Sequence, residues 1–231
     1  MTKIRFAAMP AIMAVAALQP GAALAIDLTI ESGQTETTTQ VLTSEVRRLT
    51  VEAGGTVSTM GTSVQFEGVG QRLINRGLIA SYFASAYALE SSGLRTSVLN
   101  DGSIVTYGDC SYGVYGYADY FALTNNGTIS TRGDTPSYGV YVEYADGARI
   151  INNGLIDTIG TTANGITIWG HDSVVTNHGT ISVSGEDSSG IYVWSTTPSA
   201  NLVLNTGTIR ATGSRTDGMY GQGVFANSEG M

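Results

Sequence analysis

The sequence is poor in the residues that cross-link or charge a protein. Its 231 residues include one cysteine and two histidines, and only 13% are charged. Cys110 has no partner for an internal disulfide bond, so stability must come from packing and hydrogen bonds. The net charge of −8 argues against binding nucleic acid, whose phosphates require clustered cations. Two histidines and one cysteine make no recognisable metal constellation, so we expect neither a metal nor a cofactor.

The sequence also lacks an apolar run long enough to cross a bilayer as a helix. Residues 1–25 instead follow the pattern of a secretory signal peptide. Lys3 and Arg5 precede an uncharged, largely apolar run from Phe6 to Leu18, and Ala23–Ala25 fits a cleavage site with small residues. Cleavage before Ile26 would leave a chain without lysine and with a net charge of −10. We therefore expect an exported protein.

Helical periodicity is absent, and a repeat takes its place. The motif Asn-x-Gly recurs at intervals of 25 to 28 residues, with an apolar residue two positions before each asparagine. A second block, a glycine or alanine followed by an apolar residue, begins 11 or 12 residues after each motif glycine. Side chains alternate around these positions, as in GIYVW from Gly190. Short strands at this spacing predict an all-β fold in which each repeat is one coil of a parallel β-solenoid.

The motif has a structural interpretation. Isoleucine stands two positions after every motif glycine and should form one buried column, at Ile79, Ile104, Ile129, Ile156, Ile181 and Ile209. We expect each glycine to adopt a positive φ at a tight bend. Each asparagine should bond to the turn backbone and to the amide of the next coil. The predicted structural corner residues are Asn75, Asn100, Asn125, Asn152, Asn177 and Asn205. A row of ligand-binding amides is the alternative.

The coils set the expected domain boundaries. Residues 26–70 alternate less regularly and are assigned as an N-terminal cap grading into irregular first coils. Residues 71–231 are assigned as the regular coils. Asn227, Gly230 and Met231 look like the approach to a further corner, so we expect the chain to be truncated at its C-terminal end. An unprotected strand edge there would favour aggregation.

From about residue 40 onward, the sequence resembles the passenger region of bacterial autotransporters. The segments that carry the resemblance are VEAGGTV, IINNGLI and NGITI, together with the leader. The resemblance implies a right-handed, pectin-lyase-like parallel β-helix that is exported and acts at the cell surface or outer membrane, or as a secreted protein. Family members reach the outer membrane through a C-terminal barrel, which this sequence does not contain. The implied role is structural or adhesive, with glycans or host surface proteins as partners.

A catalytic site is not expected. The string GEDSSG from Gly185 contains Asp-Ser-x-Gly but lies at a hydroxyl-rich turn of the repeat, and His171 and His178 form no familiar triad. The aspartates do not recur at one coil position, as a polysaccharide-cleaving site would require. A carbohydrate-active lyase or hydrolase is kept as the alternative function. An ice-binding threonine array is a weaker one, because Leu78, Ser103 and Leu155 interrupt the threonine column.

The clearest candidate binding feature is aromatic. In the strand after the second-block glycine, alternate residues should point outward and stack from coil to coil. The candidate ligand-contact residues are Tyr115, Tyr117, Tyr141, Trp169, Tyr192 and Trp194. We expect them to form a strip of exposed rings suited to sugars or partner proteins. The competing interpretation is that the rings only stabilise the sheet through cross-strand contacts.

Overall fold

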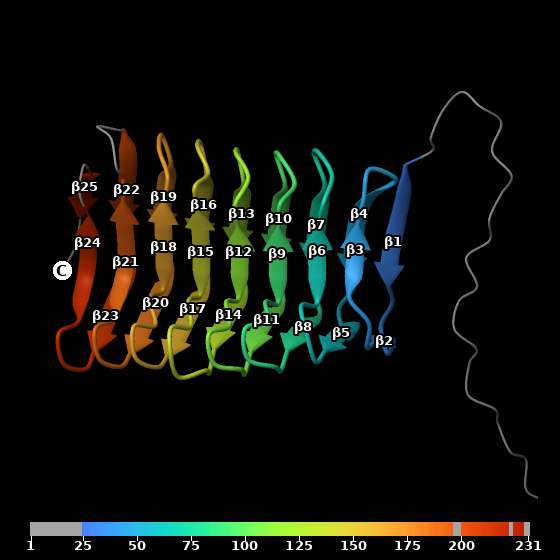
Figure 1. Cartoon of the computed structure of the whole chain (residues 1–231), viewed down its shortest axis with the longest axis horizontal. Coiled ribbons are helices and arrows are strands. Elements are labelled where there is room, and N and C mark those ends of the chain that lie inside the picture. The colour runs from blue at the N-terminus through green and yellow to red at the C-terminus, as the bar shows by residue number, and fades with distance from the viewer. Residues whose placement is uncertain (1–24, 196–199, 222–223, 229–231) are drawn as a thin grey trace, which may run out of the picture.

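The computed structural model describes residues 25–195, 200–221 and 224–228, and these residues form strands and no helix. Successive coils lie side by side and build a rod, with the first coils at one end and the last coils at the other (Figure 1). This confirms the predicted all-β, right-handed parallel β-helix with coils of about 25 residues. Residues 1–24, which hold nearly all of the predicted leader, lie outside the described residues. No helix in the described part of the chain is long and apolar enough to cross a membrane.

Each coil contributes one strand to each of three parallel sheets, which we call the first, second and third sheet in chain order. The first sheet contains the strand that ends at each corner asparagine. Its strands, in spatial order, are β1 (Ile26–Ile30), β4 (Val46–Val51), β7 (Arg72–Asn75), β10 (Ser97–Asn100), β13 (Ala122–Asn125), β16 (Arg149–Asn152), β19 (Val174–Asn177), β22 (Asn201–Asn205) and β25 (Val224–Ser228).

The second sheet follows the corner and carries the isoleucine column. Its strands are β2 (Thr35–Glu36), β5 (Thr56–Thr59), β8 (Leu78–Ser81), β11 (Ser103–Thr106), β14 (Thr128–Thr131), β17 (Leu155–Ile159), β20 (Thr180–Ser184) and β23 (Thr208–Thr212). The third sheet holds the second block of the repeat. Its strands are β3 (Gln40–Leu42), β6 (Val64–Phe66), β9 (Leu89–Ser91), β12 (Val114–Gly116), β15 (Val140–Glu143), β18 (Ile166–Trp169), β21 (Ser189–Trp194) and β24 (Asp217–Gly221).

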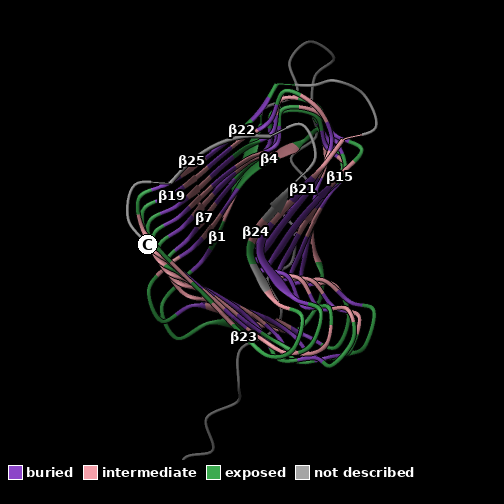
Figure 2. Cartoon of the chain, turned by 90° about the vertical axis from the view of Figure 1, so that its left-hand side faces the viewer, coloured by how far each residue is buried: buried purple, intermediate pink, exposed green. Residues whose placement is uncertain are grey.

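The core runs along the axis of the rod, where the inner faces of the three sheets meet (Figure 2). The register is strict: Ile104 pairs with Ile79 on one side and with Ile129 on the other. The isoleucines at 79, 104, 129, 156 and 181 are fully buried. Ile209 is only partly buried, because among the described residues its strand β23 is the last of the second sheet.

The corner asparagines form a continuous ladder between the first and second sheets. The Nδ2 atom of Asn75 donates to Oδ1 of Asn100 at 2.7 Å, and the same bond of 2.7 Å repeats at each step up to Asn205. The side chains are buried, and Nδ2 of Asn100 also donates to the carbonyl oxygen of Thr128. The amides from Asn75 to Asn177 each connect their own corner to the next coil, and all six corner asparagines are buried and do not form a solvent-facing binding row.

The expected positive φ at the corner glycines is wrong. None of the six motif glycines has a φ in the left-handed region. Glycine is needed for another reason, which Gly127 illustrates. A Cβ atom on Gly127 would collide with the carbonyl oxygen of Gly102 in the preceding coil, and the other motif glycines approach the previous corner in the same way. The corner requires glycine because two backbones come too close to admit a side chain.

The first coils belong to the same three sheets as the later ones. Strand β4 pairs with β7, so that Leu49 lies beside Leu73. At the corner, Val57 pairs with Ile79, and the amide of Leu78 bonds to the carbonyl oxygen of Gly55. The coils here are shorter and contain no corner asparagine, since Val51 occupies the position that Asn75 takes in the next coil.

The asparagine ladder predicts that alanine substitutions at two neighbouring positions will change the stability of the protein by very different amounts. Asn125→Ala removes the acceptor of Asn100 and the donor to Asn152 inside the buried ladder. We expect a loss of unfolding free energy of about 1–3 kcal/mol for each group left unsatisfied. Asn126→Ala is the matched control, because that side chain is exposed and should change stability by less than about 0.5 kcal/mol. Urea unfolding followed by circular dichroism measures both, and equal midpoints would contradict the structural role of the ladder.

Candidate functional site

The six candidate ligand-contact residues share the outer face of the third sheet. Tyr115 pairs with Tyr141 in the strand register, and Trp169 pairs with Trp194. The rings also touch, with centroids 5.6 Å apart for Tyr115 and Tyr141 and 5.1 Å apart for Trp169 and Trp194. Tyr117 follows β12 and lies 5.5 Å from Tyr115. Successive coils therefore bring together side chains that are far apart in the sequence.

The rings are less exposed than a simple strip would be. Tyr141 points away from the core but is only 7% exposed. Tyr115, Trp169, Tyr192 and Trp194 are half-buried, and Tyr117 alone among the six is well exposed. The expected strip of exposed rings is thus wrong in its degree of exposure, because the rings pack against one another and against a further column of tyrosines.

That further column was not identified from the sequence. Tyr87, Tyr112 and Tyr138 stand immediately before the second block and stack face to face, with centroids 5.2 and 5.0 Å apart. Tyr112 also meets Tyr141 edge to face at 5.3 Å, which explains the burial of Tyr141. The available signal was the pair Tyr-Gly at 112–113 and 138–139, in which each tyrosine stands three residues before an outward residue already chosen, Tyr115 or Tyr141.

Tyr144, 75% exposed, contacts Trp169 from the turn after β15. We call the whole assembly the aromatic face, and it consists of Tyr87, Tyr112, Tyr115, Tyr117, Tyr138, Tyr141, Tyr144, Trp169, Tyr192 and Trp194.

The charges on the aromatic face are negative. The hydroxyl of Tyr115 donates to Oε2 of Glu143 at 2.6 Å, and Glu90 accepts a bond of 2.9 Å from Gln65. Burial, followed by the hydrogen bond to Glu143 and the negative charge of that residue, raises the pKa of Tyr115 and of Tyr141 far above the usual value of 10. Tyr115 and Tyr141 are therefore uncharged at neutral pH. Strands β9, β12, β15, β18 and β21 carry no lysine or arginine.

Two hollows open in the aromatic face on either side of Trp169. The first, which we call the Thr167 hollow, has a volume of about 300 Å³ and is walled by Tyr138, Tyr141, Trp169 and Tyr192. The second, which we call the His171 hollow, has a volume of about 230 Å³ and lies between Tyr144, Trp169 and Trp194. Both are lined by aromatic rings together with polar groups, the arrangement common in sites for small ligands.

The His171 hollow contains a contact that the sequence did not predict. The Oγ atom of Ser195 lies 2.7 Å from Nδ1 of His171. Asp146 is in the same hollow, but its Oδ1 atom accepts a bond from the backbone N–H of His171. The serine and histidine side chains are thus within hydrogen-bonding distance, while the carboxylate of Asp146 accepts from the histidine backbone. His178 lies elsewhere and contacts Thr206 at 2.6 Å.

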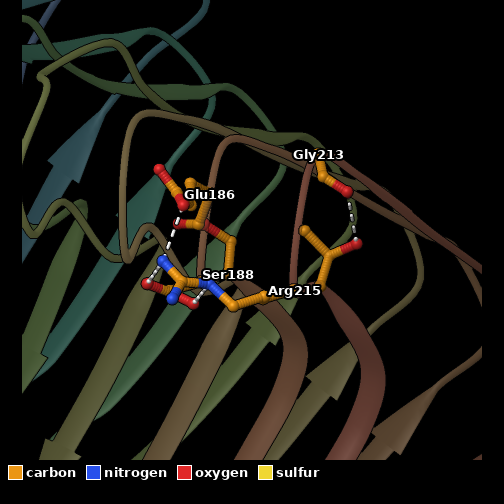
Figure 3. A network of polar contacts seen from close by, with 6 residues as sticks. Glu186, Ser188, Gly213 and Arg215 are labelled. Carbon is orange, nitrogen blue, oxygen red and sulfur yellow. Dashed lines mark hydrogen bonds and ion pairs between the residues drawn. The ribbon is translucent and has the colours of Figure 1, made fainter.

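The GEDSSG segment forms a turn beside the Thr167 hollow. Ser188 is fully buried, accepts a bond from the backbone N–H of Ala163 and contacts the carbonyl oxygens of Gly160 and Glu186. Its hydroxyl therefore holds the turn to the preceding coil. The guanidinium of Arg215 bonds to Glu186 at 2.6 Å and to Asp187 at 2.8 Å (Figure 3).

The described residues include no group of three or more His, Cys, Asp or Glu side chains arranged to hold a metal ion. Cys110 lies in a turn with a positive φ, and its Sγ atom donates to the carbonyl oxygen of Thr135.

Comparison with known proteins gives one match. The family model described as the BigA third pectate lyase-like domain matches residues 21–230. No curated protein and no solved structure matches the sequence. The family description agrees with the pectate-lyase-like β-helix that the resemblance implied.

The raised tyrosine pKa values predict a loss of stability at high pH. In the unfolded chain a tyrosine releases its proton near pH 10, whereas Tyr112, Tyr115 and Tyr141 keep theirs in the folded protein. The stabilising effect is therefore complete below pH 10 and is lost as the pH rises above it. Urea midpoints measured between pH 8.5 and 11 should fall, and the fall should be smaller in Tyr115→Phe. A midpoint that stays constant over this range would contradict the prediction.

Proposed function

Because the chain belongs to the family of the BigA third pectate lyase-like domain, we propose that it is a β-helix module of a bacterial surface protein that adheres through its aromatic face. The module is exported by its N-terminal leader and acts at the cell surface or outer membrane, or after secretion, in the manner of an autotransporter passenger. The rod supplies length and rigidity. Its partners are glycans or host surface proteins, and no nucleic acid takes part.

The observation that carries this proposal is the concentration of aromatic rings on one sheet. Rings that only stabilise a sheet can be distributed over every outer face. Here Trp169 and Trp194 lie together with the tyrosines of the third sheet, around two hollows. Amphipathic rings gathered around concave surfaces are typical of binding sites, because each ring offers a large contact area at a low cost in conformational entropy.

The main test compares two double variants. Trp169→Ala with Trp194→Ala should reduce attachment to epithelial cells and to immobilised glycans to the background of an uncoated surface, with an unchanged β-sheet circular dichroism spectrum. The matched control replaces Tyr82 and Tyr107, an exposed stacked pair outside the third sheet, with rings 4.9 Å apart. The control should attach like the unmodified protein.

Attachment by the tryptophan variant at the level of the unmodified protein would exclude the aromatic face as the adhesive surface. Treating the cells with periodate or with protease before the assay separates the two classes of partner. Loss of binding after periodate indicates a glycan, and loss after protease alone indicates a protein.

We further propose that the module breaks no bond, and the His171 hollow gives this statement a direct test. Pectin and polygalacturonate incubated with the protein should show no time-dependent increase in unsaturated products or reducing ends. A fluorophosphonate reagent should leave Ser195 unmodified in mass spectra. The Ser195–His171 contact is the observation that favours the alternative of a carbohydrate-active enzyme. Turnover that disappears in Ser195→Ala or Asp146→Asn would support that alternative.

A further inference from the structure

The Thr167 hollow lies where one aromatic column ends and a second is interrupted, both in the same coil. The column of Tyr87, Tyr112 and Tyr138 continues with Asn164, which stands two residues before Ile166 as Tyr138 does before Val140. The second column runs from Tyr141 to Thr167, because these residues pair in the register of β15 and β18, and Thr167 pairs in turn with Tyr192. Two small polar side chains therefore replace two rings, and the space left open is about 300 Å³.

The base of this hollow is polar and uncharged. Asn164 and Thr167 are 6% and 3% exposed, and Nδ2 of Asn164 donates to Oγ1 of Thr167 at 3.1 Å. The Oδ1 atom of Asn164 accepts a bond of 2.7 Å from the backbone N–H of Ser189, which fixes the amide orientation. Thr167 uses only its oxygen as acceptor in the first bond, so its hydroxyl hydrogen is available to another acceptor.

The wall offers one more polar group. The indole Nε1 of Trp169 is buried and has no hydrogen-bond partner. Buried donors are normally paired, so this N–H is an exception. Trp169 lines the hollow together with Asn164 and Thr167.

The charges around the hollow select against anions. Asp187 is at its edge, and Glu143 lies next to Trp169 in the neighbouring strand. Arg215 is already shared between Glu186 and Asp187, so these three residues together carry a negative charge (Figure 3). A carboxylate ligand would meet like charge with no free cation from the surrounding strands, which costs binding energy.

We propose that the Thr167 hollow is a subsite for one uncharged pyranose ring of a glycan. The apolar C–H face of the sugar packs on the tyrosine and tryptophan rings, while a sugar hydroxyl bonds to Thr167. Uronic and sialic acids are excluded by the surrounding carboxylates, so the preference is opposite to that for a pectate polyanion. This inference rests on the proposed adhesive function and names the ligand class of the same face.

The first test uses the unmodified protein and needs no variant. The probes are a panel of neutral hexose and N-acetylhexosamine oligosaccharides with their uronic-acid and sialylated counterparts, and it includes fully methyl-esterified galacturonan paired with polygalacturonate. Tryptophan fluorescence titration should show neutral members binding about tenfold or more tightly than their charged counterparts. Added salt should narrow the difference by screening the repulsion. Binding of no neutral member, or tighter binding of the acidic ones, would overturn the proposal.

The second test closes the hollow. Thr167→Tyr places a ring between Tyr141 and Tyr192, where the column is interrupted, and should weaken binding of the neutral glycan about tenfold or more. Thr176→Tyr is the matched control, because it makes the same change on the outer face of the first sheet, in β19, and should bind normally. Binding by a folded Thr167→Tyr variant at the unmodified level would also overturn the proposal.

The outcomes separate this inference from the proposed function. If Trp169→Ala with Trp194→Ala abolishes cell attachment while Thr167→Tyr changes nothing, adhesion through the aromatic face stands and the subsite is wrong. If both variants attach normally, both proposals fail.

Discussion

Each coil depends on its neighbours for hydrogen bonds that it cannot make by itself. Parallel strands pair only between coils, about 4.8 Å apart, so the backbone groups of one coil are satisfied by the next. This spacing makes two demands at the corner. The backbone must pass close to the previous corner, and a side-chain amide must reach the next one. Glycine meets the first demand at Gly127, and asparagine meets the second at Asn125. The repeat of the sequence follows from this requirement for in-register contact.

The same register determines the outer surface. A side chain that points outward in one coil lies beside the equivalent side chain of the next, so a residue type that recurs once per coil becomes a column. Tyr112 and Tyr138 are separated by one coil in the sequence and yet stack with their rings 5.0 Å apart. A binding face can therefore be built from side chains spaced a whole coil apart, without any loop to position them, and the rigid core fixes its geometry.

Much of the fold could be predicted because the core obeys the repeat. The burial of Ile79 through Ile181 and the pairing of Trp169 with Trp194 follow from alternation and spacing alone. The reason for the corner glycine could not be predicted, since the close approach of two backbones is a property of the stack and leaves no local signal.

The degree of exposure of Tyr141 and the contact between Ser195 and His171 depend on side chains that extend across coils and around turns. The sequence repeat predicts where the backbone of these residues lies in each coil. It does not predict which neighbours their side chains contact.

The departures from the repeat are where specificity can arise. An uninterrupted column of rings would give a flat, uniform surface that treats every ligand alike. Asn164 ends one column and Thr167 interrupts another in the same coil, and both residues line the Thr167 hollow. Because the neighbouring strands are held by the core, the rings on either side do not collapse into the gap, as the rings of a flexible loop would. A solenoid can thus form a hollow on its surface where small polar residues stand at positions that carry a ring in other coils.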